Sequence, residues 1–422
     1  MKGIEEKQIE APYELPEGWK WCRLGEVGET LTGSTPSKKK TEYYGGDFPF
    51  FKPADLEQGI NLFQSSEYLS AEGKKVSRIV PAKSTLICCI GSIGKSGYSL
   101  REGTTNQQIN AIIPHKYIDS KYLFHAVNTE DFINQLWSKA SSTTISIVNK
   151  SKMDNCIIPL PPTLAEQQRI VNRIESMFAK LDEAKEKAQN VVDGFETRKA
   201  AILHQAFTNK LKIENGKLKD EEWKERKLGE ICEVTSSKRV YQTEQTSSGI
   251  PFLRIADIMC KIQNKDVFPE LFISAERYKK LQSQNLVPKE NEILVTSRGT
   301  LGKCYLIKKD DMFYFQDGMI SWLKNIDRNI SSQYLIYLFQ SKEITNQIEE
   351  MQNGSTVNYL SISMLKKISI PIPPFNFQLS IVNFLDSVLE KERTAKEAAE
   401  AVLEQIDLLK KSILARAFRG EL

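Results

Sequence analysis

Histidine is scarce in this sequence, and cysteine follows no ligand pattern. The 422 residues include only three histidines, which are far apart at His115, His125 and His204. The seven cysteines form no Cys-x-x-Cys pair, and only Cys88 and Cys89 lie close together. This distribution argues against a zinc site or a histidine-based catalytic centre. An odd number of unpatterned cysteines indicates reduced thiols, as in a cytoplasmic protein.

Long apolar runs and a strong net charge are also missing. No stretch approaches the ~20 apolar residues that span a bilayer, and the N-terminal residues lack the apolar run of a signal peptide. We therefore expect a cytoplasmic protein without membrane contact. The net charge is +4, from 58 basic and 54 acidic residues, so any nucleic-acid surface must come from local basic patches.

The sequence contains an internal repeat, with a period of about 205–212 residues. The matching blocks occur in the same order in both copies, which makes coincidence an unsatisfactory explanation. The blocks are Trp19-Lys20 with Trp223-Lys224, Leu24-Gly25-Glu26 with Leu228-Gly229-Glu230, Ala54-Asp55 with Ala256-Asp257, Gly91 to Lys95 with Gly299 to Lys303, Tyr122-Leu123 with Tyr334-Leu335, and Ile158-Pro159-Leu160-Pro161-Pro162 with Ile370-Pro371-Ile372-Pro373-Pro374.

Each copy has a globular part followed by a long helix. The globular parts contain β-branched and aromatic runs separated by Gly, Ser and Pro turns, which predict an α+β domain rich in antiparallel strands. Short helices are expected at 120–137 and 332–350. The expected organisation is an N-terminal tail (1–14), a first domain (15–160), a central helix (161–211), a linker with a second domain (212–373) and a C-terminal helix (374–422).

The two long helices carry an apolar seam with spacings of three and four residues, which is typical of a coiled coil. Arg198 interrupts the first seam and Glu392 the second. Because nothing else in the chain has this length and period, we expect the two helices to pack against each other, antiparallel and related by a pseudo-two-fold axis. The seam residues are Ile170, Ile174, Met177, Leu181, Ala184, Ala188, Val191, Phe195 and Ile202, and Ile381, Leu385, Val388, Ala395, Ala399, Val402, Ile406, Leu409 and Ile413.

Polar loops at matching places in the two copies are candidate DNA contacts. A loop with adjoining basic and aromatic residues occurs in both copies, and a lysine follows each glycine loop. Amide side chains suit bidentate contact with adenine. A solvated surface loop is an equally good interpretation of any single position. The candidates are Lys38, Lys39, Lys40, Tyr43, Lys95, Asn106, Gln107, Gln108 and Thr143 in the first copy, and Lys238, Arg239, Tyr241, Arg298, Lys303, Gln316 and Ser355 in the second.

Three enzymatic interpretations are weaker. The glycine loop before Ser96 resembles the end of a phosphate-binding loop, but Cys89 stands where that motif has glycine. The proline pairs resemble the core of an amino-methyltransferase motif, but Leu160 and Ile372 precede them instead of Asn, Asp or Ser. The pattern of paired carboxylates followed by a lysine, which is typical of nuclease sites, is too degenerate to identify such a site from the sequence. We expect no catalytic, cofactor or metal site.

The order of these pieces resembles the specificity subunit of Type I restriction-modification systems. The resemblance rests on the repeated Trp-Lys…Leu-Gly-Glu opening, the loop from Ser297 to Lys303, the Ile-Pro-x-Pro-Pro hinge, and the Ala-Phe endings at 206–207 and 417–418. It covers about 15–422. Ile90 departs from the second copy, which has Arg298 at the matching position, so a basic contact there is in doubt for the first domain.

This resemblance implies that each domain recognises one half of a bipartite, asymmetric DNA site and that the coiled coil sets the gap. It also implies partners: double-stranded DNA, two methyltransferase subunits, and restriction subunits that supply translocation and cleavage. The chain itself would be non-catalytic. The alternative is a coiled-coil scaffold whose domains bind proteins and not DNA.

Overall fold

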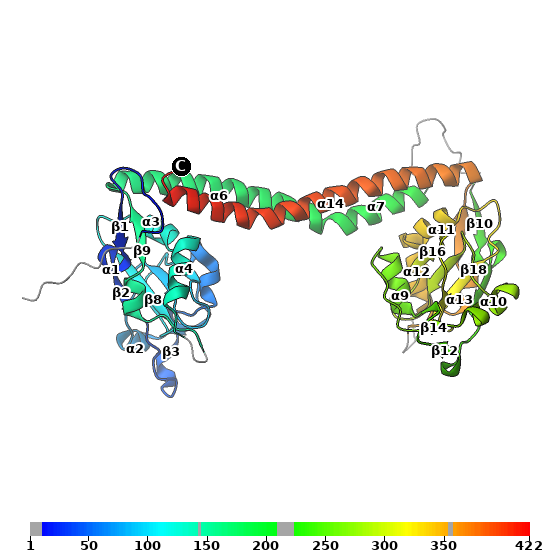
Figure 1. Ribbon diagram of the computed structural model, residues 1–422, viewed down its shortest axis with the longest axis horizontal. Coiled ribbons are helices and arrows are strands. Elements are labelled where there is room, and N and C mark those ends of the chain that lie inside the picture. The colour runs from blue at the N-terminus through cyan, green and yellow to red at the C-terminus, as the bar shows by residue number, and fades with distance from the viewer. Residues whose placement is uncertain (1–10, 142–144, 209–222, 353–357) are drawn as a thin grey trace, which may run out of the picture. The chain divides into compact units, whose positions relative to one another are not determined.

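The computed structural model describes residues 11–141, 145–208, 223–352 and 358–422. The chain divides into two compact units (Figure 1). Unit 1 contains residues 1–189 and 400–422, and unit 2 contains residues 190–399. Each unit therefore combines one globular domain with parts of two long helices, one from each copy of the repeat.

Domain 1 is built on a four-stranded antiparallel sheet in the order β2-β8-β5-β6, with a second sheet in the order β4-β3-β7. In the second sheet β3 and β7 run parallel. The strands are β1 Lys20–Arg23, β2 Gly28–Thr32, β3 Tyr44–Phe51, β4 Tyr68–Leu69, β5 Thr85–Cys88, β6 Ser96–Tyr98, β7 Thr104–Thr105, β8 Ile109–Pro114 and β9 Ile157–Leu160. The helices are α1 Leu24–Val27, η1 Thr41–Tyr43, η2 Asp55–Asn61, α2 Ala71–Lys75, α3 Ser120–Ala126, α4 Glu130–Lys139 and α5 Lys150–Asp154.

Domain 2 repeats this topology. Its main sheet has the order β11-β18-β15-β16, and its second sheet has the order β12-β14-β13-β17 with β13 and β17 parallel. The strands are β10 Lys224–Lys227, β11 Glu233–Ser236, β12 Gln245–Thr246, β13 Ile250–Leu253, β14 Phe272–Ile273, β15 Ile293–Thr296, β16 Cys304–Leu306, β17 Tyr314–Phe315, β18 Ile320–Lys324 and β19 Ser369–Ile372. The helices are α8 Leu228–Ile231, η4 Gln242–Glu244, α9 Ile255–Ile262, α10 Ala275–Ser283, α11 Ser332–Phe339, α12 Lys342–Gln352 and α13 Ile362–Lys367.

The predicted α+β class is confirmed, and the two parallel strand pairs are an addition to it. The short helices predicted at 120–137 and 332–350 are present, and each range is divided between two helices, α3 with α4 and α11 with α12. In domain 1 the hydroxyl of Thr129 accepts a hydrogen bond from the amide of Phe132 and so begins α4 as a new helix.

A strand pair closes each domain where the chain enters and leaves it. β1 pairs antiparallel with β9, and β10 pairs in the same way with β19. The hinge prolines end β9 and β19, and a glutamine then lies in the first turns of the following helix. Gln167 accepts a hydrogen bond from the amide of Asp119 at 2.8 Å, and Gln378 accepts one from Ser331 at 2.9 Å. Both glutamines are buried, so they fix each helix to its own domain.

The long helices are α6 (Leu164–Asp193), α7 (Phe195–Phe207) and α14 (Phe375–Phe418). The structure divides the predicted central helix at Gly194. A Cβ atom at this position would lie 2.3 Å from Nη1 of Arg198, so glycine makes room for that side chain. The backbone at Gly194 stays in the right-handed helical region, with φ −76° and ψ −10°.

Helices of the two copies pack antiparallel within each unit, as predicted. In unit 1, Lys410 pairs with Asp182 at 2.6 Å, and Arg169 reaches the carbonyl of Leu422 at 2.9 Å. In unit 2, Arg198 pairs with Glu392 at 2.7 Å. Of the main seam residues, Ile174, Ala188, Leu385, Ala399 and Ile406 are buried, and Leu181, Phe195 and Ile413 are half-buried.

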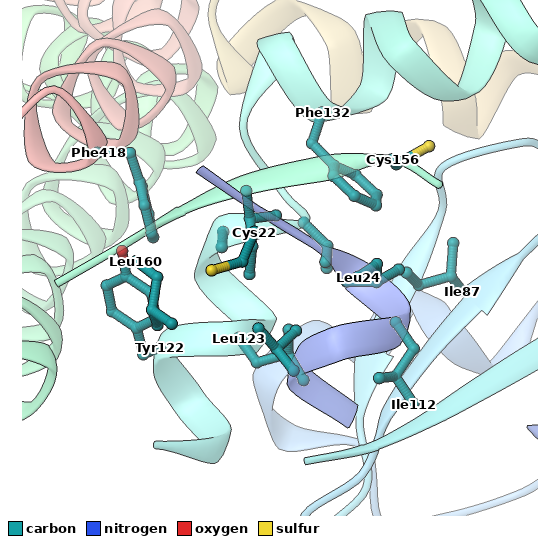
Figure 2. Packing of buried hydrophobic residues seen from close by; sticks show 14 of the residues in the cluster. Cys22, Leu24, Ile87, Ile112, Tyr122, Leu123, Phe132, Cys156, Leu160 and Phe418 are labelled. Carbon is teal, nitrogen blue, oxygen red and sulfur yellow. The ribbon is translucent and has the colours of Figure 1, made fainter. Parts of the chain in front are cut away.

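The predicted seam is wrong at Ala395, Val402 and Leu409, which remain exposed. An α-helix has 3.6 residues per turn, so a stripe with a period of 3.5 drifts around it over several turns. Near its end α14 buries Leu414, Ala417 and Phe418 instead. These side chains belong to the core of domain 1, and Phe418 lies 5.0 Å from Tyr122 between ring centroids (Figure 2). Phe207 contacts Tyr334 of domain 2 in the equivalent way, at 5.4 Å.

Arg198 and Glu392, the two residues that interrupt the apolar seams, face each other. Arg198 also donates to the carbonyl of Val191 at 2.8 Å. When the repeats are superposed, the matching positions in unit 1 are Leu409 and Leu181. The helix pair of unit 2 thus contains an ion pair at the positions where the helix pair of unit 1 has two leucines.

Replacing Arg198 alone by leucine is expected to lower the free energy of unfolding by about 1 kcal/mol, because it leaves Glu392 half-buried without its partner. The double variant Arg198→Leu/Glu392→Leu should return to within about 0.5 kcal/mol of the unchanged chain, since two apolar residues can replace an ion pair at little cost. Urea denaturation of both variants measures the difference. Equal stability of the single and double variants would contradict coupling between the two side chains.

Candidate DNA-binding loops

In domain 1 the first polar loop lies against the segment that follows β7. The amide of Ser34 donates to the carbonyl of Thr105 at 2.9 Å, and Thr35 donates to the side chain of Gln107 at 2.5 Å. Gly33 allows this approach, because a Cβ atom there would lie 2.1 Å from the carbonyl oxygen of Asn106. The structure therefore brings the predicted loop and the predicted amide cluster together.

The basic residues of this loop point to solvent. Lys38, Lys39 and Lys40 are exposed, and the Lys40 ammonium lies 3.1 Å from the hydroxyl of Tyr43. The loop is closed by Tyr44, whose hydroxyl donates to the carbonyl of Pro36 at 2.6 Å. Figure 1 shows β3 and α2 at the end of domain 1 that is farthest from α6.

The amide cluster is only partly available for contact. Asn106 donates from its side chain to the side chain of Gln108 at 2.9 Å and accepts from the Gln108 amide at 3.1 Å. These two side chains are half-buried, whereas Gln107 is exposed. Gln107 is thus the member of the cluster that is best placed to reach a base edge.

In domain 2 the matching loop also lies against the corresponding strand, β17, but it is held through a side-chain hydroxyl and not through a backbone carbonyl. The amide of Lys238 donates to the hydroxyl of Tyr314 at 2.8 Å, and Arg239 lies 3.8 Å from Asp317. Burial raises the pKa of Tyr314 to about 12, so its hydroxyl stays protonated. Gln316 donates its amide to the carbonyl of Leu253, as Asn106 does to Phe51 in domain 1. Tyr241 is 62% exposed, and the guanidinium of Arg239 lies 5.8 Å from its ring centroid.

The two glycine loops, residues 91–95 in domain 1 and 299–303 in domain 2, differ in the charge of the residues around them. The ammonium of Lys95 pairs with Glu57 at 2.8 Å, so this predicted phosphate contact is neutralised by a residue of its own domain. In domain 2 the guanidinium of Arg298 lies 5.1 Å from the ring centroid of Tyr359, and Lys303 is exposed. Ile90 occupies the place of Arg298 in domain 1, where it makes a backbone bridge to Ile147.

Thr143 and Ser355, two further candidates, lie outside the described residues. Sequence reasoning missed Glu57 and Tyr359, which partner candidate residues. Glu57 and Tyr359 are distant in sequence from their partners, so no local signal indicates them.

Two further properties of the described residues concern metal binding and membrane insertion. In the described part of the chain, no group of three or more His, Cys, Asp or Glu side chains could hold a metal ion. No helix among the described residues is both long enough and apolar enough to cross a membrane.

Comparisons with known proteins all identify the same family. A family model for the Type I restriction modification DNA specificity domain matches twice, at residues 16–192 and 220–405. The chain is 27% identical over 381 residues to the Type I restriction enzyme MjaIX specificity subunit of Methanocaldococcus jannaschii, covering 85% of this chain and 84% of that protein. It is 23% identical to the EcoKI specificity subunit of Escherichia coli K12, covering 97% and 90%.

Solved structures show the same fold. The HsdS subunit from Thermoanaerobacter tengcongensis superposes with a TM-score of 0.68 at 20% identity, covering 98% of this chain and 100% of that one. A chain from a structure on complex assembly and conformational transition of the type I R-M system superposes with a TM-score of 0.70, also at 20% identity, covering 97% and 100%. With two family matches that span most of its length, this chain belongs to the Type I restriction-modification DNA specificity family.

Proposed function

We propose that this chain is the DNA specificity subunit of a Type I restriction-modification complex. Each domain recognises one half of a bipartite, asymmetric site, and the helices that join the domains set the gap. One observation carries the proposal: in both domains an equivalent backbone hydrogen bond, from Asn106 to Phe51 and from Gln316 to Leu253, extends the parallel strand pair of the second sheet, but the loops around it carry different side chains. Loops that are held in the same position but carry different polar side chains can recognise two different base sequences.

Within this proposal the chain is non-catalytic. The two methyltransferase subunits supply adenine methylation, and restriction subunits supply translocation and cleavage. The candidate contacts remain those predicted from the sequence, with Gln107, Tyr241 and Arg298 favoured by their exposure or by the aromatic contacts of their loops. The boundaries that we propose are 15–160 for the first recognition domain and 212–373 for the linker together with the second.

Genome-wide methylation sequencing tests the proposal. Cells that carry this gene with its methyltransferase gene are expected to show adenine methylation at a two-part motif with a fixed non-specific gap. Deletion of this gene alone should abolish that methylation. A continuous palindromic motif, or methylation that survives the deletion, would refute the assignment.

Salt dependence separates DNA recognition from a protein-binding scaffold. Binding that rests on phosphate contacts weakens steeply as salt rises, whereas a protein scaffold leaves duplex DNA unbound at every salt concentration. The same purified chain, incubated with DNA, S-adenosylmethionine, magnesium and ATP, should neither methylate nor cut the DNA. Either activity in the chain alone would show that it is an enzyme in its own right.

A further inference from the structure

Each domain has an antiparallel backbone bridge just before its glycine loop, but the bridge joins different residues in the two copies. In domain 1 it joins Ile90 to Ile147, and in domain 2 it joins Arg298 to Tyr359. The isoleucine side chains have no hydrogen-bond donors, whereas a guanidinium has five. The same place in the backbone therefore carries an apolar pair in one domain and a cation beside an aromatic ring in the other.

The backbone around the two bridges is held in the same way. In domain 2 the amide of Leu360 donates to the carbonyl of Ser297 at 3.0 Å, and in domain 1 the amide of Val148 donates to the carbonyl of Cys89 at 2.9 Å. Leu360 and Val148 are both buried, so each bridge is anchored to the core of its own domain. The two bridges thus differ in the side chains that an equivalent backbone carries.

The bridge of domain 2 lies at the end of the main sheet from which the candidate DNA-binding loops leave. β11 ends at Ser236, the neighbouring strand β18 begins at Ile320, and β15 ends at Thr296. Because these strands are antiparallel neighbours, their loops emerge side by side, and adjacent backbones are about 4.8 Å apart. Arg298, two residues after the end of β15, therefore lies at the same end of the sheet as the other candidate contacts of domain 2.

The side chain of Arg298 is exposed and oriented by Tyr359. Its guanidinium lies 5.1 Å from the centroid of the Tyr359 ring. In the part of the chain that the structure describes, this guanidinium has neither a carboxylate partner nor a hydrogen bond. A cation over an aromatic face is attracted by the ring, and a planar guanidinium can also stack on it. The donors of Arg298 therefore remain available for a ligand.

Tyr359 is itself held in place by Gln352. The Gln352 side chain accepts a hydrogen bond from the Tyr359 amide at 2.9 Å and donates one to the Tyr359 carbonyl at 3.2 Å. The next residue, Leu360, belongs to the buried core of domain 2. Since the backbone of Tyr359 is fixed on both sides, its ring orients Arg298 before any ligand arrives. Such preorganisation lowers the entropy cost of binding.

An oriented guanidinium at this end of the domain suits two ligands on DNA, a phosphate or a guanine. Arginine can donate two parallel hydrogen bonds to O6 and N7 of guanine in the major groove. Phosphates are alike in both half-sites, so a phosphate contact does not account for an isoleucine at the same place in domain 1. A side chain that differs between the copies on an equivalent backbone instead favours recognition of a base.

We propose that Arg298 recognises a guanine in the half-site of domain 2 through the major groove, and that Tyr359 is the positioning residue for its guanidinium. The bridge between Ile90 and Ile147 makes no such contact in domain 1. This inference rests on the proposed function and adds to it one base of the recognised sequence.

The test uses the full chain co-purified with its methyltransferase subunits and a fluorescent duplex that carries the motif found by methylation sequencing. Each base pair of the two half-sites is replaced in turn, and affinity is measured by anisotropy. Arg298→Ala should lower the affinity for the motif by on the order of ten- to a hundred-fold and abolish discrimination at one G·C pair only. The matched control is Ile90→Ala, at the equivalent place in domain 1, which should leave discrimination at that pair unchanged.

Modified bases at the same G·C pair identify the atoms that are contacted. A guanine analogue in which carbon replaces N7 should weaken binding by the unchanged complex by about ten-fold, because one charge-assisted hydrogen bond is lost. The same analogue should have no effect on the Arg298→Ala complex. Inosine keeps both N7 and O6, so the unchanged complex should bind it as it binds guanine. Equal sensitivity of both complexes to the analogue would contradict a contact by Arg298.

Two substitutions of Tyr359 test its positioning role. Tyr359→Phe keeps the aromatic face and should keep the guanine preference. Tyr359→Leu keeps an apolar side chain but removes the ring, so the preference at that one G·C pair should fall by about two- to five-fold. Discrimination at the other base pairs and the urea midpoint should stay the same. Loss of discrimination at every position, or a lower urea midpoint, would show that Tyr359 has only a structural role.

The outcomes distinguish the inference from the proposed function. If Arg298→Ala weakens binding to every sequence equally and makes the salt slope about one unit shallower, the contact is to a phosphate and the guanine assignment is refuted. A half-site of domain 2 without an essential guanine, or an Arg298→Ala complex that binds like the unchanged one, also refutes it, while DNA recognition stands. If the unchanged complex prefers no two-part motif, the proposed function itself fails.

Discussion

Replacing Phe418 with alanine is expected to lower the free energy of unfolding by about 3–5 kcal/mol, the range observed for truncation of large buried aromatic side chains. Phe418 is 1% exposed and packs on Tyr122 within the core of domain 1, although it lies at the end of the C-terminal helix. Its backbone carbonyl also accepts a hydrogen bond from Tyr13 at 3.2 Å. The variant leaves a cavity where the helix end joins domain 1, and urea denaturation measures the loss.

Leu408→Ala is the matched control for this prediction. Leu408 lies on the same helix but is 65% exposed, so the substitution should change stability by no more than about 0.5 kcal/mol. If Phe418→Ala is as mild as Leu408→Ala, the end of α14 does not form part of the core of domain 1. Phe207→Ala provides a parallel case in unit 2, where this side chain is 4% exposed and contacts Tyr334.

Deleting one heptad from each long helix is expected to abolish methylation at the original motif. Because Asp182 pairs with Lys410 in the antiparallel helix pair, residues 183–189 face residues 403–409, and their joint removal preserves the seven-residue repeat of the seam. Each helix becomes about 10 Å shorter at ~1.5 Å per residue. At ~3.4 Å per base pair, the recognised gap should shorten by about three base pairs while both half-sites stay the same.

Methylation sequencing of cells that carry the shortened chain reads the gap directly. The control removes residues 183–189 alone, which takes the two helices out of register and should lower stability without producing a new motif. An unchanged motif in the double deletion would contradict the role of the helices in setting the gap. An altered half-site would instead place part of the base recognition within the helices.

Several features of this protein follow from the sequence alone, because the signals for them are local. The duplication is visible as repeated blocks, and the coiled coil as a regular spacing of apolar residues from Ile170 and from Ile381. The proline pairs mark where each domain ends, since two consecutive prolines lack the amide donors that strand pairing needs. The loops that carry Lys38 and Lys238 are also indicated, because basic and aromatic residues recur there despite poor identity.

Features that depend on the meeting of distant segments required the tertiary structure. In the sequence, Arg198 and Glu392 are two separate interruptions of the apolar seams. Only the packing of the helices brings them together as an ion pair. Lys95 and Lys303 look equivalent in sequence, but Glu57 neutralises the first, whereas no carboxylate in the described residues pairs with the second.

The sequence by itself determined the duplicated frame, its two kinds of element and the family, because periodicity and motif order are properties of contiguous residues. The tertiary structure decided that each helix end completes the core of the domain from the other copy, through Phe207 and Phe418. It also decided which charges remain available for a ligand. The physical reason is that burial and electrostatic pairing depend on through-space distances of a few ångströms, and residues far apart in the sequence set those distances.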